Sequence, residues 1–365
     1  MMLAHLIIVD LTEDLGELAG RMLAELGARV VRAEAGDAAW DHGKGTGDIE
    51  ALLVTADILF RNPGRDHDAL AAANPKLIDV VVAPFLPGGP NDGRPETDLT
   101  LMARSGLMTI IGDPDRAPLT LPGEQAYALA GIQAVIGALT ALHARAASGK
   151  GQLVEVSAYQ SAVLANYREP LTWQWTGRVG NRTGNLLIRG KSGVRQIWPC
   201  ADGFVTWALV DNQPMMRGMV KVMGDAAGPL AAVDWDAILV ADMPRETLIE
   251  WEAVVEAFFL KHTRAELGAM SQANGLGLSW IDTPADALAS EHLAARGLWR
   301  DVDGVKLPGR LWVSSLEEQL SPSPSGEGLG VGPVSLTETV RQEDRPHPNP
   351  SPEGEGLKKS RETAR

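Results

Sequence analysis

Residues 6–34, LIIVDLTEDLGELAGRMLAELGARVVRAE, predict one strand–helix–strand unit. The unit begins with Leu6–Val9, a short apolar run that is typical of a strand buried on both faces. Apolar residues then recur at helical spacing as far as Leu26, Gly27 ends the helix, and Ala28–Arg32 forms the second strand. This order is the first half of a doubly wound α/β sheet, in which ligands bind beyond the strand ends.

The turn after the first strand is acidic, because Asp10–Gly16 reads DLTEDLG. A dinucleotide-binding turn of the G-x-G-x-x-G type holds a pyrophosphate with bare backbone N–H groups. Carboxylates at Asp10, Glu13 and Asp14 would repel that anion, although Glu34 stands where a ribose contact is expected. The sequence therefore argues against a nicotinamide-dependent enzyme.

Composition and charge exclude several other classes of protein. The chain has 365 residues and a net charge of −14, which disfavours nonspecific binding to nucleic acid or to an anionic membrane. Cys200 is the single cysteine, so an internal disulfide is excluded and a reducing, cytoplasmic location is expected. No apolar run reaches the roughly 20 residues of a membrane helix, and the N-terminus lacks the basic region of a signal peptide.

The rest of the chain continues the alternation of strands and helices and then changes character. Strands are predicted at 57–60, 77–82 and 153–156, with a long helix over 126–147. We expect a large α/β domain over 1–195, a smaller α+β domain over 196–300, a return segment to the large domain over 301–316, and a disordered tail over 317–365. In that tail, SPSGEGL at 323–329 nearly recurs as SPEGEGL at 351–357, a composition that cannot bury a core.

Common catalytic motifs are absent from the sequence. The seven histidines show neither H-x-x-x-H nor H-E-x-x-H spacing, so no metal site is predicted. No G-x-S-x-G turn precedes a helix, and no phosphate-binding Walker loop occurs. The glycine-rich stretch GKGTG at 43–47 either cradles a phosphate through backbone N–H groups or forms a solvated turn, and the turn is the favoured interpretation.

Several segments together resemble the class III CoA-transferase family, the CaiB/BaiF type, which also includes acyl-CoA racemases. The resemblance covers roughly residues 6 to 313 in the family's order. It is carried by VDLTEDLGELAGRMLAELGARVVRAE (9–34), ADILFRNPG (56–64), LAAANPKLIDVVVAPFLPGGP (70–90), DLTLMARSGLMTIIG (98–112), AYALAGIQAVIGALTALHARAASGKGQLVEVSAYQSAV (126–163), GRVGNRTGN (177–185), IWPCADGFVTWAL (197–209) and ASEHLAARGLW (289–299).

The resemblance implies a fold, a substrate and a mechanism. The fold is an open, mostly parallel sheet with helices on both faces and a smaller α+β domain, with two chains interlocked as a dimer. The substrates are an acyl-CoA thioester and a carboxylic acid, with no tightly bound cofactor and no metal. In the mechanism a buried aspartate attacks the thioester, and mixed anhydrides and an aspartyl-CoA thioester pass CoA to the acceptor acid.

The sequence departs from the family at the nucleophile. Members read V-D-V-S-x-x-D, with the last aspartate as nucleophile, whereas residues 154–160 here read VEVSAYQ. Gln160 therefore stands at the nucleophile position, and an amide cannot form the anhydride. Glu155 is a possible substitute base, because related racemases place a general-base aspartate at about this position together with a histidine. Glu169, one helix later, would substitute only through a shifted fold.

The resemblance also implies binding residues and a cover over the active site. Arg61, Pro63, Gly64 and Arg104 are the expected CoA-binding residues, with the guanidinium groups as phosphate partners. The loop 177–193, through Gly184, Gly190 and Gly193, resembles the family's glycine-rich active-site loop, and an inter-domain linker is an equally good interpretation.

Three hypotheses for the function remain open. The chain is an acyl-CoA-handling enzyme with altered chemistry, or it is a non-catalytic subunit that pairs with an aspartate-bearing homologue, or it is a decayed pseudoenzyme. A homodimer and a heterodimer both fit, and we expect no nucleic-acid or membrane partner.

Overall fold

A six-stranded parallel sheet organises the first half of the chain in the computed structural model, which describes residues 2–36, 38–189, 192–302 and 304–309. The strand order is β3-β2-β1-β4-β5-β6, and all five pairings are parallel. The strands are β1 (Ile7–Leu11), β2 (Arg29–Arg32), β3 (Lys44–Thr46), β4 (Ile58–Arg61), β5 (Ile78–Ala83) and β6 (Gln152–Ser157). The sequence's prediction of an open α/β sheet is confirmed.

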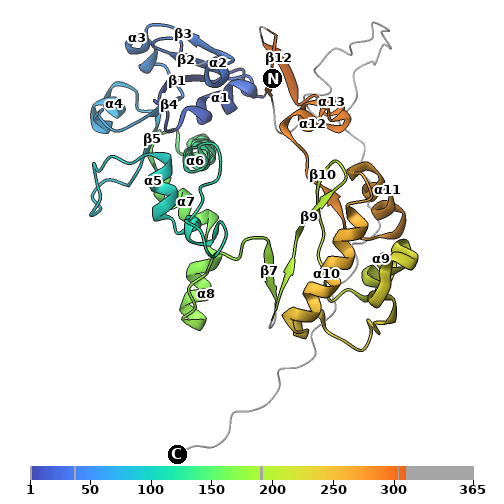
Figure 1. Ribbon diagram of the computed structural model, residues 1–365. Coiled ribbons are helices and arrows are strands. Elements are labelled where there is room, and N and C mark those ends of the chain that lie inside the picture. The colour runs from blue at the N-terminus through green and yellow to red at the C-terminus, as the bar shows by residue number, and fades with distance from the viewer. Residues whose placement is uncertain (1, 37, 190–191, 303, 310–365) are drawn as a thin grey trace, which may run out of the picture. The chain divides into compact units, whose positions relative to one another are not determined.

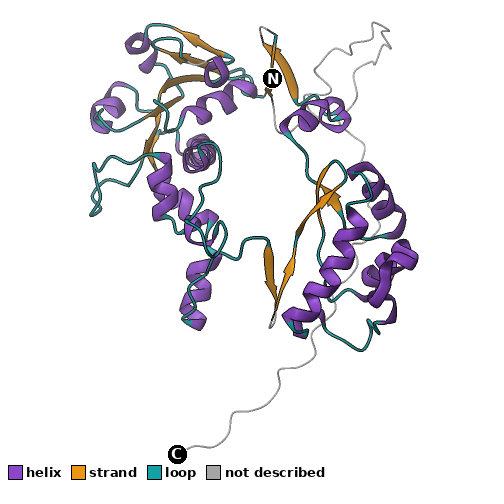
Figure 2. Cartoon of the chain, in the orientation of Figure 1, coloured by secondary structure: helices purple, strands orange, loops and turns teal. Residues whose placement is uncertain are grey.

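Helices cover both faces of this sheet, as Figure 1 and Figure 2 show. They are α1 (Glu17–Glu25), α2 (Ala38–Asp41), α3 (Ile49–Leu53), α4 (His67–Ala73), α5 (Asp98–Arg104), α6 (Gln125–Ser148), α7 (Ala158–Ala165) and α8 (Arg168–Thr176), with a short 3₁₀ turn η1 (Leu107–Ile110). Alternate strand residues face opposite ways, so two separate cores form, one under α1 and α6 and the other under α3.

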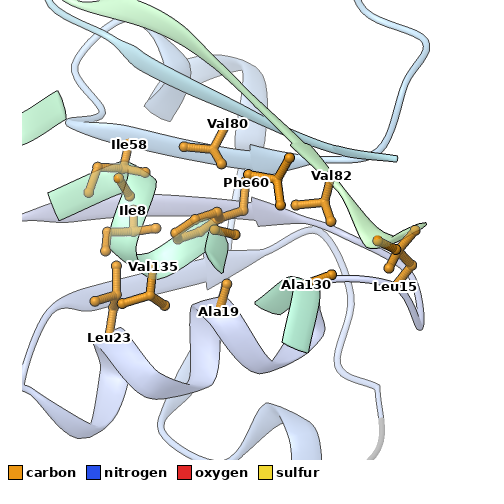
Figure 3. Packing of buried hydrophobic residues seen from close by; sticks show 14 of the residues in the cluster. Ile8, Leu15, Ala19, Leu23, Ile58, Phe60, Val80, Val82, Ala130 and Val135 are labelled. Atoms are coloured by element: carbon orange, nitrogen blue, oxygen red, sulfur yellow. The ribbon is translucent and has the colours of Figure 1, made fainter. Parts of the chain in front are cut away.

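The larger core is built where α1 and α6 pack on the sheet (Figure 3). Ile8, Ile58 and Phe60 are fully buried there, in contact with small residues of the helices such as Ala19 and Ala130. α6 is also the one helix within the described ranges that is long and apolar enough to cross a membrane by length and composition. Because its inner face forms part of this core, we describe it as a core helix.

The acidic first turn is stabilised by its own side chains. Asp10 Oδ1 accepts hydrogen bonds from the backbone N–H of Thr12 at 3.1 Å and from its hydroxyl at 2.6 Å. Gly16 begins α1 with a φ of 105°, and a Cβ at Gly20 would lie 2.1 Å from Asp10 Oδ2. Glycine at position 20 therefore allows the helix to pass directly over the buried aspartate.

The interpretation of residues 43–47 as a solvated turn is wrong. Residues 44–46 form β3, which pairs in parallel with β2, and the Lys44 side chain is only 1% exposed. The lysine is buried because its Nζ lies 2.8 Å from Asp10 Oδ2 and 3.2 Å from Asp41 Oδ1. A lysine cation already shared by two carboxylates is not available as a phosphate ligand, and the alternative of a phosphate cradle made by backbone N–H groups stays a prediction.

The second half of the chain builds smaller sheets and a helical layer around its own core. The strands are β7 (Leu186–Arg189), β8 (Ser192–Arg195), β9 (Ile197–Cys200), β10 (Gly203–Thr206), β11 (Ser279–Trp280), β12 (Trp299–Val302) and β13 (Val305–Pro308), and all their pairings are antiparallel. The helices are α9 (Gln213–Met223), α10 (Arg245–Phe259), α11 (Arg264–Asn274), α12 (Pro284–Ala289) and α13 (Glu291–Ala295), with the 3₁₀ segments η2 (Gly224–Ala232) and η3 (Val240–Asp242).

Aromatic side chains dominate this second core. The indole of Trp198 is fully buried, and its ring lies 5.7 Å from that of Phe259 in an edge-to-face arrangement. The Trp198 Nε1–H donates to the carbonyl of Trp207 at 2.6 Å. The domain boundaries expected from the sequence stay a prediction, and the end of the return segment and the whole repeat-containing tail lie outside the described residues.

Candidate active site

Gln160 lies in the first turn of α7, directly after the edge strand β6. Ser157 caps this helix, because its Oγ accepts the backbone N–H of Gln160 at 3.2 Å and donates to the carbonyl of Pro84 at 3.1 Å. The backbone N–H of Tyr159 donates to the same carbonyl at 3.1 Å. These bonds fix the start of α7 to the chain that follows β5, so the position of residue 160 is set by rigid elements.

A cavity of about 390 Å³ brings Gln160 and Glu155 together. Its volume falls in the range of small-molecule sites. The other residues that line it come from α6, β6 and α7, namely Gln133, Ile136, Gly137, Val154, Val156, Ser157, Ser161 and Leu164. Gly137 permits the close approach of α6 to β6, since a Cβ there would lie 2.8 Å from Val154 Cγ1.

The side chains of this cavity limit its chemistry. Glu155 is the one carboxylate among the lining residues, and no histidine is among them. The Gln160 amide can donate and accept hydrogen bonds, but it carries no charge and is not a nucleophile at neutral pH. A carboxyl group therefore faces this cavity only from position 155, and the role expected for Glu155 stays a prediction.

Arg104 does not line this cavity and lies instead on an aromatic pair, Phe85 and Tyr159. The rings of Phe85 and Tyr159 are 5.5 Å apart, and the guanidinium carbon of Arg104 lies 5.3 Å and 5.8 Å from their centroids. Its Nε is 3.8 Å from a carboxylate oxygen of Glu96. Because Tyr159 precedes Gln160, this arginine is a cation near the start of α7 with 35% of its side chain exposed.

Arg61 is held in a buried ion pair. Its Nε and Nη2 donate to the two carboxylate oxygens of Asp79, each at 2.8 Å, and the two residues are 4% and 0% exposed. His67 Nδ1 lies 3.0 Å from Asp79 Oδ2 on the same side. Pro63 and Gly64 follow β4 at the surface, where Gly64 adopts a φ of 134°. The roles expected for these residues in CoA binding stay predictions.

The glycines of the expected active-site loop lie in different settings. Gly184 has a φ of 55° and donates its N–H to the carbonyl of Gly112 at 3.0 Å, and Arg182 Nε donates to the carbonyl of Asp113 at 3.2 Å. Gly193 belongs to β8, where its carbonyl accepts a bond from Arg245 at 2.9 Å. Gly190 lies outside the described residues. A role for this loop as a cover stays a prediction.

Charged side chains on and next to strands β1, β2 and β3 form a buried network that the sequence did not predict. Arg32 Nη1 lies 2.9 Å from Glu17 Oε1 and 2.6 Å from Asp41 Oδ1. Burial alone would raise the pKa of Asp41, but hydrogen bonds from Arg32, Gly36 and Lys44 outweigh it and lower the pKa. The members of this network, Glu17, Arg32, Asp41 and Lys44, come from separate elements, so no single stretch of the sequence signals it.

Comparisons with known proteins agree with this fold. The family model described as CoA-transferase family III matches residues 41–326. The subunit BbsE of succinyl-CoA:(R)-benzylsuccinate CoA-transferase from Thauera aromatica is 26% identical over 340 residues, covering 80% of this chain and 82% of that protein. Succinate–glutarate CoA-transferase from Agrobacterium fabrum is 27% identical over 353 residues, covering 83% and 86%.

Solved structures share the fold. A CAIB/BAIF family protein from Brucella suis superposes with a TM-score of 0.74 at 24% sequence identity, covering 85% of this chain and 92% of that one. A hypothetical protein from Mycobacterium tuberculosis gives a TM-score of 0.67 at 21% identity, covering 86% and 93%. The chain therefore belongs to CoA-transferase family III, as the sequence resemblance predicted.

Proposed function

We propose that this chain handles acyl-CoA thioesters in CoA transfer between an acyl-CoA and a carboxylic acid, and that it does so without a nucleophile at position 160. Family membership supports the substrate class. The single observation that supports the missing nucleophile is the place of Gln160, which lies in the first turn of α7 and lines the cavity of about 390 Å³.

The chemistry explains why this residue matters. In the transfer, an enzyme carboxylate oxygen attacks the thioester carbonyl, the C–S bond breaks, CoA leaves as the thiolate, and a mixed anhydride between the enzyme and the first acid remains. The thiolate then attacks the enzyme's acyl carbon and releases the first acid, and the acceptor carboxylate repeats the sequence in reverse. The enzyme carboxylate is the nucleophile in the first step and the leaving group in the last, and the amide of Gln160 can serve as neither.

The proposal therefore makes this chain the non-nucleophilic subunit of a CoA-transferase, paired with a homologue that keeps the aspartate. Two relatives support a heteromeric assembly by their names. One is the subunit BbsE described above, and the other is the beta subunit of succinyl-CoA–L-malate CoA-transferase from Chloroflexus aurantiacus, which is 31% identical over 130 residues. In such an assembly this chain would bind the thioester, with Arg104, near the start of α7, as a phosphate partner.

A second candidate rests on Glu155, because this carboxylate lines the same cavity as Gln160. Glu155 would act either as the attacking carboxylate or as the base of an acyl-CoA racemase or isomerase. No histidine is among the lining residues, which makes a two-base racemase the weaker version of this candidate. Glu155 could remove the proton from one face of the α-carbon, but no second group would return a proton to the opposite face.

The test is calorimetry combined with turnover by the purified full-length chain. We expect CoA and acetyl-CoA to bind, Arg104→Gln to weaken both, and the chain alone to show no transfer of CoA to a labelled carboxylic acid. Glu155→Gln should leave binding unchanged. Turnover that disappears in Glu155→Gln would establish the second candidate, and no binding of either thioester or CoA would overturn the proposal.

A further inference from the structure

A second cavity lies along α8 and shares no residue with the Gln160 cavity. Its volume is about 430 Å³, which suits a small organic ligand. The wall consists of one face of α8, the turn that follows α5 and the chain after α8. The lining residues are Ser105, Gly106, Thr109, Asn166, Glu169, Pro170, Trp173, Gln174, Arg178, Val179 and Gly180.

Glu169 brings an unsatisfied negative charge to this cavity. Its Oε2 is buried and has no hydrogen-bond partner among the described residues. The backbone at Gly180 passes close to this carboxylate, because a Cβ at Gly180 would lie 2.1 Å from Glu169 Oε2. A buried carboxylate oxygen without a donor is costly, so a ligand that brings a positively charged donor would gain strongly from binding here.

Arg178 brings an unpaired positive charge to the same cavity. Within the described part of the chain its guanidinium forms no hydrogen bond or ion pair, and only its backbone N–H is engaged, with the Thr176 hydroxyl at 3.2 Å. Glu169 and Arg178 thus line one cavity without pairing with each other. Two separated opposite charges complement a ligand that carries both charges itself.

Apolar side chains in the wall of this second cavity add a preference for the kind of ligand that it binds. Trp173 is 57% exposed and Val179 is 63% exposed, although both are large apolar side chains. An indole face next to a carboxylate favours a cationic group through its quadrupole, and its area favours an aliphatic chain.

We propose that this second cavity binds a small zwitterionic amino acid with an aliphatic side chain. The ammonium group pairs with Glu169, the carboxylate pairs with Arg178, and the side chain packs on Trp173. The inference goes beyond the proposed function and does not depend on it, because none of these residues lines the Gln160 cavity.

Three probes with the same aliphatic chain test the proposal by titration calorimetry of the full-length protein. Norleucine carries both charges, hexanoate lacks the ammonium group, and pentylamine lacks the carboxylate. We expect norleucine to bind at least about tenfold more tightly than either single-charge analogue, since each lost charged hydrogen bond corresponds to a tenfold change or more. Equal binding of the three probes, or no binding of norleucine, would overturn the proposal.

Paired variants locate the charges. Glu169→Gln should lower the affinity for norleucine to that of hexanoate, and Arg178→Gln should lower it to that of pentylamine. Glu250→Gln and Arg168→Gln are matched controls, because both residues are exposed and neither lines the cavity. Unfolding temperatures verify that each variant folds. If Glu169→Gln or Arg178→Gln binds norleucine as wild type does, the assignment is wrong. CoA titration of Glu169→Gln, whose residue lies outside the expected active-site loop, should be unchanged, which keeps this test separate from that of the proposed function.

Discussion

Lys44 Nζ lies 2.8 Å from Asp10 Oδ2, and these two side chains are 1% and 0% exposed. The pair joins β3 to the end of β1, across the strand that lies between them. A lysine in a glycine-rich segment thus neutralises the aspartate of the acidic first turn, which would otherwise be an unpaired charge in the core.

Removing one partner of this pair should destabilise the protein strongly. We expect Lys44→Met to lower the free energy of unfolding by about 3–5 kcal/mol, because it leaves Asp10 buried without its cation. The double variant Lys44→Met/Asp10→Leu should lose less than the single variant. Urea unfolding followed by circular dichroism measures both. Equal losses in the single and double variants would show that the charge of Asp10 is not the cause.

Asp41 predicts a pH dependence of stability. Hydrogen bonds from Arg32, Gly36 and Lys44 outweigh burial and hold its pKa below the ordinary value of 3.8. A carboxyl whose folded pKa is lowered stabilises the fold above its unfolded pKa, and that contribution is lost as the pH falls from 3.8 through the lowered value.

The variant Asp41→Asn isolates this effect. We expect it to be less stable than wild type at neutral pH, with a difference that shrinks as the pH falls below 3.8. Urea titrations at a series of pH values give the two curves. A difference that stays constant across the acidic range would contradict the assignment.

If the chain dimerises as expected, the outer side of the Gln160 cavity should be covered by the partner chain. Two residues that line it are large and exposed, Ile136 at 52% and Leu164 at 57%, and Leu153 on the neighbouring edge strand is 37% exposed. Apolar groups gathered around a site favour burial by a partner chain. We therefore predict that this region is covered in the assembled protein.

Cysteine footprinting measures that cover. In Leu164→Cys we expect a maleimide reagent to label the new thiol about tenfold more slowly in the assembled protein than after unfolding in urea, because interlocked chains do not separate on dilution. Val54→Cys is the matched control, because Val54 is 53% exposed on α3's side of the molecule and the native Cys200 is buried. Equal labelling rates at positions 164 and 54 under both conditions would exclude an interface at this face.

The central part of the fold was predictable from local pattern. The predicted strands Leu6–Val9 and Ala28–Arg32 overlap β1 and β2 because each is a short, largely apolar run, and the helical spacing between them gives α1. The edge strand β3 was missed because Lys44–Thr46 is polar and glycine-rich, and it becomes a strand only by pairing with β2.

The candidate site was predictable residue by residue but not as an arrangement. Glu155 and Gln160 were singled out from their positions in one motif, whereas their meeting in a cavity depends on α6 lying against β6 at Gly137. The contact made by Arg61, in contrast, could not be predicted from the sequence at all. Its partner Asp79 is 18 residues away and reaches it only because β4 and β5 are neighbours, so the ion pair had no signal in the sequence.

The central claim is that position 160, and not the rest of the site, prevents this chain from transferring CoA by itself. Gln160→Asp restores a carboxylate at the start of α7, and Gln160→Asn is the matched control of similar size without the charge. The measurement is the transfer of CoA from acetyl-CoA to an isotopically labelled carboxylic acid by each purified full-length variant. We predict turnover, with a hydroxylamine-sensitive enzyme adduct, for Gln160→Asp and none for wild type or Gln160→Asn. Transfer by the wild-type chain alone, or an inactive Gln160→Asp variant that still binds CoA, would contradict the claim.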